Sequence, residues 1–114
     1  MTVGLKAEKL AREFLVSQGL RFVQANFRLR IGEIDLIMRD QETLVFVEVK
    51  YRSSERFGTS VEQVTPRKIQ KIKLVAGAYL QRYTHDLPVV RFDVVGISPQ
   101  GASYRFNWVK GAFE

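Results

Sequence analysis

The chain has 114 residues, of which 46% are hydrophobic and 26% are charged, as expected for one soluble globular domain. It has no cysteine, which excludes disulfides and thiol catalysis and fits a reducing cytoplasm. No apolar run approaches the roughly 20 residues that a membrane-spanning helix needs. The net charge of +6 favours a polyanionic partner, above all nucleic acid. We therefore expect residues 1–114 to form a single cytoplasmic domain that does not contact the membrane.

An amphipathic helix is predicted over residues 5–18. Its buried stripe follows the helical repeat and consists of Ala7, Leu10, Ala11, Phe14 and Leu15. Gly19 then provides a natural end to the helix. Glu8 belongs neither to the apolar stripe nor to the charged outer face, and it lies at the border between them.

Three strands are predicted next, over residues 21–29, 32–38 and 44–52, and the short turns between them indicate an antiparallel meander. Side chains alternate along a strand, so Glu33 and Asp35 should share one face. For the same reason Glu48 and Lys50 should share a face. The opposite faces should carry Ile34, Val47 and Val49.

A second helix is predicted to start with Thr65 as its N-cap and Pro66 at its first position. Its buried stripe should consist of Ile69, Ile72, Ala76, Tyr79, Leu80 and Tyr83. A strand over residues 89–97 follows this helical crossover and should lie parallel to the third strand. A final strand should place Tyr104, Phe106 and Trp108 in the core or at a subunit interface. The expected class is α/β, with core order α-β-β-β-α-β and a mixed central sheet flanked by helices.

Carboxylates interrupt the otherwise apolar second and third predicted strands. Charged side chains are seldom buried there unless they are paired or bind a metal. Pairing across the turn at Asp40 would bring Asp35 near Glu48. Together with the backbone carbonyl of Val49, these oxygens suit Mg²⁺ or Mn²⁺ better than Zn²⁺. Lys50 could then position or deprotonate a water molecule, or stabilise charge on phosphoryl oxygens. The alternative is a solvated cross-strand charge pair.

Basic residues are dense on the second helix, and there is no acid from Gln63 to His85. Those placed to contact phosphates are Arg67, Lys68 and Lys71. The alternative is a solvated outer face. Residues 53–60 follow Lys50, and with Arg52 and Arg56 they would form either a substrate-covering loop or a disordered one.

Five motifs together resemble the YraN-like family of small, endonuclease-like bacterial proteins. They are GEIDLI (32–37), FVEVKYR (46–52), FG (57–58), TPRK (65–68) and RFDVV (91–95). The resemblance spans nearly the whole chain. It implies a restriction-endonuclease-like core of the PD-(D/E)XK nucleases, which is related to Holliday-junction resolvases.

The resemblance also implies roles residue by residue. Asp35 and Glu48 match the metal-binding acids, and Lys50 matches the motif lysine. Glu8 matches a further ligand on the first helix, while Gln63 and Lys68 match auxiliary substrate contacts. Two positions depart from the pattern, because Ile34 stands where the motif has Pro and Ala7 stands where Gly is expected.

The leading hypothesis is an endonuclease that depends on Mg²⁺ or Mn²⁺ and cuts DNA of particular shape, such as branched DNA. A homodimer would suit two-fold junctions. Two alternatives stay open: a non-catalytic nucleic-acid-binding module on a nuclease scaffold, and a basic domain that binds an acidic protein.

Overall fold

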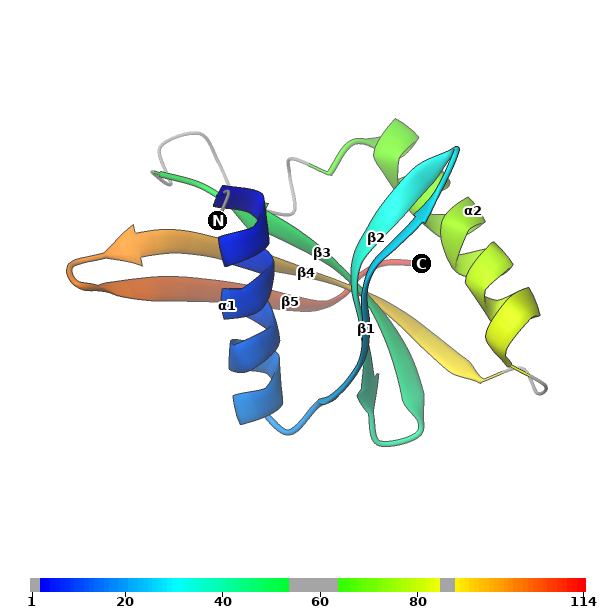
Figure 1. The fold of residues 1–114 in the computed structure, drawn as a ribbon, viewed down its shortest axis with the longest axis horizontal. Helices are drawn as coiled ribbons and strands as arrows, with labels where there is room; N and C mark the ends of the chain where they lie inside the picture. Colours follow the sequence, from blue (N-terminus) through cyan, green and yellow to red (C-terminus); the bar gives the residue numbers. More distant parts are fainter. Residues whose placement is uncertain (1–2, 54–63, 85–87) are drawn as a thin grey trace.

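The computed structural model describes residues 3–53, 64–84 and 88–114 (Figure 1). Its elements are α1 (Val3–Ser17), β1 (Arg21–Leu29), β2 (Gly32–Asp40), β3 (Thr43–Tyr51), α2 (Pro66–Tyr83), β4 (Val89–Gln100) and β5 (Ser103–Phe113). The α/β class and the predicted order of elements are confirmed. No helix in the described ranges combines the length and the apolar character needed to cross a membrane.

The five strands form one mixed sheet in chain order, β1-β2-β3-β4-β5. The meander of β1, β2 and β3 is antiparallel, as predicted. β3 and β4 are parallel because α2 connects them as a crossover, and β5 returns antiparallel to β4. The turn between β2 and β3 is tighter than predicted, since Asp40 and Thr43 pair with each other. Gln41 takes a φ of 55° in this turn.

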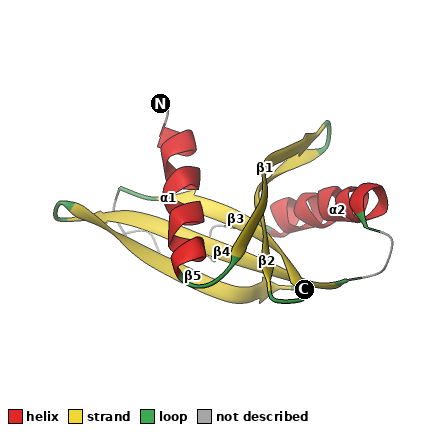
Figure 2. Cartoon of the chain, turned by 60° about the horizontal axis from the view of Figure 1, so that its bottom comes forward, coloured by secondary structure: helices red, strands yellow, loops and turns green. Residues whose placement is uncertain are grey.

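The two helices are well separated and pack on opposite faces of the sheet (Figure 2). Alternation along β3 separates the two cores: Leu44 and Phe46 pack with α2, whereas Val45 and Val47 pack with α1. By the same alternation Glu48 falls on the α2 face of β3.

α2 begins as predicted. The Thr65 side chain accepts a hydrogen bond from the backbone N–H of Lys68 at 3.2 Å, and Pro66 occupies the first turn. The buried side chains of α2 are Ile72, Val75, Ala76 and Tyr79. The prediction that Tyr83 is buried was wrong, because its side chain at the end of the helix is 57% exposed.

The predicted aromatic strand is confirmed in β5, where the aromatic side chains cover the α1 face. Phe14 of α1 stacks on Phe106, with ring centroids 4.4 Å apart, and meets Trp108 edge-on. These rings therefore contribute to the core and do not form an exposed base-stacking platform.

The hairpin of β1 and β2 rotates halfway along its length. Ala25 and its partner Leu36 pack on the α1 side, whereas Phe27 and its partner Ile34 pack on the α2 side. Residues two apart on a regular strand share a face, so both strands must turn over between these pairs. The prediction that Ile34 points the same way as Val47 was therefore wrong. The change of face coincides with Asn26, whose φ is 54°.

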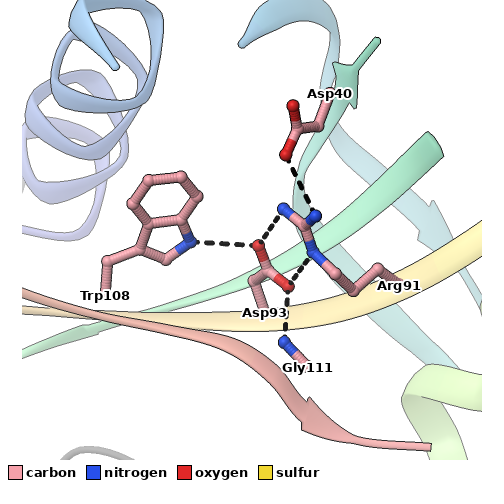
Figure 3. A network of polar contacts seen from close by, with 5 residues as sticks. All are labelled: Asp40, Arg91, Asp93, Trp108 and Gly111. Atoms are coloured by element: carbon pink, nitrogen blue, oxygen red, sulfur yellow. Dashed lines mark hydrogen bonds and ion pairs between the residues drawn. The ribbon is translucent and has the colours of Figure 1, made fainter. Parts of the chain in front are cut away.

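A polar network around the buried charge of Asp93 ties β4 to β5 and β2 (Figure 3). Asp93 is 0% exposed and accepts hydrogen bonds from both Nε and Nη2 of Arg91, each at 2.9 Å. It also accepts from Trp108 Nε1 and from the backbone N–H of Gly111, each at 3.0 Å. Arg91 donates in addition to Asp40. We call Asp40, Arg91, Asp93, Trp108 and Gly111 the Asp93 network.

Candidate functional site

The site begins where β2 leaves β3. Their ladder runs from the turn to the pair Leu36 and Val47 and does not continue to Asp35. Instead the Asp35 side chain replaces the ladder: its Oδ2 accepts a hydrogen bond from the backbone N–H of Val49 at 2.8 Å. The predicted approach of these two strands is thus confirmed, and it holds the Asp35 carboxylate at the end of their pairing.

Three carboxylates converge at this point. One oxygen from each of Glu8, Glu33 and Asp35 lies within 4.8 Å of the other two. We call these three residues the acidic centre. Around Mg²⁺, ligand oxygens at about 2.1 Å from the ion lie roughly 3–4 Å apart, so small side-chain rotations would suffice to enclose it.

A neighbouring amide supports this fit. Oδ1 of Asn26 is buried and has no hydrogen-bond partner within the described part of the chain. A buried acceptor without a donor is costly, and a hydrated cation carries water that can donate to it. The donor set is oxygen throughout, which suits Mg²⁺ or Mn²⁺ and not a soft metal.

The acids of the centre disfavour one another's charge. Burial and the nearby charge of Glu48 raise the pKa of Asp35 to about 7, against the hydrogen bond from Val49. Burial also raises the pKa of Glu8, opposed by a hydrogen bond from Asn26 and assisted by the charge of Glu33. A divalent cation would relieve this repulsion.

Glu48 lies beside the acidic centre and is buried, with 4% exposure. Its Oε1 lies 2.6 Å from Nζ of Lys68 and 3.7 Å from Nζ of Lys50. The ammonium groups of Lys50 and Lys68 therefore compensate the negative charge of Glu48, which was predicted to bind a metal. Its charge nevertheless reaches Asp35, because it raises the pKa of that residue.

The two lysines differ in their proton affinity. Burial lowers the pKa of Lys50, and the charge of Lys68 lowers it further. Burial acts in the same direction on Lys68, but the hydrogen bond and charge of Glu48 outweigh it and raise the Lys68 pKa. Lys50 is therefore the one of the two that more readily gives up a proton.

A pocket of about 460 Å³ opens between the tip of the β1–β2 hairpin and the start of α2. Its lining residues are Gly32, Glu33, Thr65, Arg67, Lys68, Lys71 and Ile72. We call it the basic pocket. Glu33 belongs to both the pocket and the acidic centre, so the two adjoin. The predicted clustering of the three basic residues at the start of the helix is thus found.

The other predicted site residues either lie away from the basic pocket or fall outside the residues that the structure describes. Arg52 follows β3, where its backbone N–H donates to the carbonyl of Ile97, and it does not line the basic pocket. Arg56 and Gln63, and most of the predicted loop over residues 53–60, lie outside the described residues. For Val49, the described contact is made by its N–H and not by the predicted carbonyl.

Glu33 is the site residue that sequence reasoning missed. Its place on the same strand face as Asp35 was visible in the sequence, but no motif assigned it a role. In the structure it joins the acidic centre and also pairs with Nε of Arg28 at 2.8 Å. Strand alternation was the signal that could have identified it.

Comparison with known proteins agrees with the resemblance seen in the motifs. Residues 7–97 match the model of a family described as "Uncharacterised protein family UPF0102". A UPF0102 protein of Shewanella frigidimarina is 47% identical over 113 residues, covering 99% of this chain and 100% of the relative. One of Nitrosococcus oceani is 45% identical, covering 96% of this chain and 90% of the relative. The YraN-like family is the UPF0102 family, and the chain belongs to it.

Proposed function

We propose that this protein is a metal-dependent endonuclease that hydrolyses phosphodiester bonds in DNA. The observation that carries the proposal is the position of the acidic centre, next to the basic pocket and to a lysine whose pKa is lowered. Carboxylates that hold a divalent cation beside a phosphate-binding surface are the arrangement that phosphodiester hydrolysis needs.

Glu8, Glu33 and Asp35 would hold the cation, and Glu48 would join them once it is released from Lys68. When bound, Mg²⁺ or Mn²⁺ would acidify an attacking water and neutralise charge on the phosphate. Lys50 would orient that water or accept its proton, a role favoured by its lowered pKa. Lys68 would then be available to the phosphoryl oxygens.

The basic pocket would hold the DNA backbone. Arg67, Lys68 and Lys71 line it at the start of α2. A helix start and three cations both attract phosphate, and such contacts weaken as salt rises. The net charge of +6 supports the same partner.

The test compares cleavage of branched, nicked, single-stranded and duplex DNA with Mg²⁺ or Mn²⁺. Asp35→Ala and Lys50→Ala should each lose at least 100-fold of the native rate, an estimate of roughly 3 kcal/mol in the barrier. Glu42→Gln, at an exposed acid in the β2–β3 turn, is the matched control and should cut normally. Absence of cleavage on all four substrates with either metal would overturn the enzymatic role.

A non-catalytic DNA-binding module is the second candidate. The 2.6 Å pair between Lys68 and Glu48 favours it, because it occupies an acid that the reaction would need. Salt-dependent binding without cleavage, unchanged by Asp35→Ala, would support this module over the enzyme.

A further inference from the structure

Asn26 sits where the β1–β2 hairpin turns over. The pairing passes from Ala25 and Leu36 to Phe27 and Ile34, so Asn26 lies across from Asp35. Its φ of 54° is in the left-handed region, which asparagine tolerates better than most residues. This conformation rotates the hairpin, so that one half packs on the α1 face of the sheet and the other half packs on the α2 face.

The rotation has two consequences for the site. Asp35 leaves the β2–β3 ladder, and its carboxylate becomes available beside Glu8 and Glu33. The outer half of the hairpin reaches α2, where a Cβ added to Gly32 would lie 3.4 Å from Val75 and 3.5 Å from Lys71. This approach forms one wall of the basic pocket.

The Asn26 side chain also acts on the acidic centre. Together with Glu8 of α1 it lines one surface pocket, and as a hydrogen-bonding neighbour it opposes the rise that burial causes in the Glu8 pKa. An amide N–H can donate to a carboxylate, so this juxtaposition allows Asn26 to hold the Glu8 side chain in place. The remaining amide oxygen is the buried acceptor without a partner.

We propose that Asn26 is a positioning residue of the acidic centre, which it serves by turning Asp35 out of the sheet and by fixing the carboxylate of Glu8. This proposal rests on the proposed function, in which the positioned carboxylates bind a cation. Residues that orient metal ligands typically contribute 10–100-fold to metal affinity. Asn26 combines this role with a backbone conformation that few other side chains adopt.

The first test is Mn²⁺ binding to the full chain, measured by titration calorimetry. Asn26→Gly keeps access to positive φ and removes the amide, so its unfolding midpoint should stay near the native value while Mn²⁺ affinity falls about 10–100-fold. Gln41→Gly is the matched control, because Gln41 has nearly the same φ of 55° in the β2–β3 turn, outside the acidic centre. It should leave the affinity unchanged.

A double-mutant cycle shows whether Asn26 acts through Glu8. In a Glu8→Gln background, Asn26→Gly should weaken Mn²⁺ binding by much less than it does in the native chain. An Asn26→Gly protein that binds Mn²⁺ as tightly as the native chain would overturn the proposal.

A metal-free measurement separates this proposal from the proposed function. Carbon-13 NMR of the Glu8 side chain should give one rotamer in the native protein and averaged rotamers in Asn26→Gly. If the native chain binds no Mn²⁺ but Glu8 loses its rotamer in the variant, the positioning role stands and the cation site is overturned. If Glu8 keeps a single rotamer in the variant, the positioning role itself is overturned.

Discussion

Asp35 and Asp93 lie on β2 and β4 of the same sheet, and their surroundings are opposite in kind. Asp93 is fully buried and receives four hydrogen bonds, two of them from an arginine. Asp35 receives a backbone hydrogen bond from Val49 and faces the charges of Glu48 and Glu8. Hydrogen-bond donors converge on Asp93, whereas Asp35 lies close to other acids.

The difference separates a carboxylate whose partners are supplied by the fold from one that we propose to be functional. A buried charge is tolerated in a fold when its partners satisfy its hydrogen-bonding capacity, as around Asp93, and removing such a partnership is then destabilising. An acid kept among other acids raises the free energy of the folded state and is retained where a ligand supplies the missing charge. The RFDVV motif therefore contributes to the architecture, and GEIDLI contributes two carboxylates to the acidic centre, where we propose the site.

The largest effect should come from breaking the Asp93 network. Asp93→Ala would leave Arg91, the indole of Trp108 and the Gly111 amide without their shared acceptor. We expect a loss of about 3–5 kcal/mol in the free energy of unfolding, measured by urea denaturation. A loss below about 1 kcal/mol would show that the network is not structural.

Asp35→Asn should change stability in the opposite direction. The folded state raises the Asp35 pKa from 3.8 to about 7, so it binds a proton that the unfolded chain has already released. Without metal, native stability should therefore fall as pH rises from about 4 to 7 and stay low above that range. The variant should lack this decline and gain roughly 1–3 kcal/mol at pH 8. Metal-free unfolding curves of both proteins at pH 5 and pH 8 measure it.

The titration of Asp35 should also appear in the pH dependence of Mn²⁺ affinity. Mn²⁺ competes with the proton for Asp35, so native affinity should rise with pH and level off above about 7. Calorimetry between pH 5.5 and 8.5 would follow it. Affinity that is independent of pH across this range would place the cation away from Asp35.

Trp108→Phe should give a smaller loss, because it removes one donor from Asp93 and keeps the ring that faces Phe14. We expect about 1 kcal/mol in thermal or urea unfolding. A loss as large as that of Asp93→Ala would mean that the whole network depends on the indole N–H and that the other donors to Asp93 do not compensate for its removal.

The smallest effect should come from Arg28→Ala. The Arg28 side chain is 68% exposed, so its pair with Glu33 should contribute less than about 0.5 kcal/mol to folding. Its removal frees Glu33 for the acidic centre, and Mn²⁺ affinity should rise a few-fold. A Glu33→Gln variant that binds Mn²⁺ normally would remove Glu33 from the centre.

The regular elements followed closely from the sequence because local signals determine them. Thr65 and Pro66 mark the start of a helix through backbone geometry alone. Polar turns between short apolar runs predict a meander, and a helical crossover predicts a parallel pair. The approach of Asp35 to β3 followed from that register.

The departures arise where one residue changes the geometry of its neighbours. Alternation placed Ile34 on the wrong face because the hairpin turns over at Asn26, and no periodic pattern encodes the φ of that residue. The pairing of Glu48 with Lys68 depends on how α2 docks on the sheet, which spacing along the chain does not contain. The role of Asp93 depends likewise on donors from β5.

The chain-order sheet has a consequence for how the protein folds. Every neighbouring pair except β3 and β4 closes through a short turn, so two units, the β1–β2–β3 meander and the β4–β5 hairpin, can form from local contacts. Joining the units requires closing the long β3–β4 connection, which costs loop entropy and should limit the folding rate. The Arg91–Asp40 pair links the two units, because its residues lie 51 positions apart in the sequence, on β4 and β2. Its contribution should therefore appear mainly in the unfolding rate, after the two units have met.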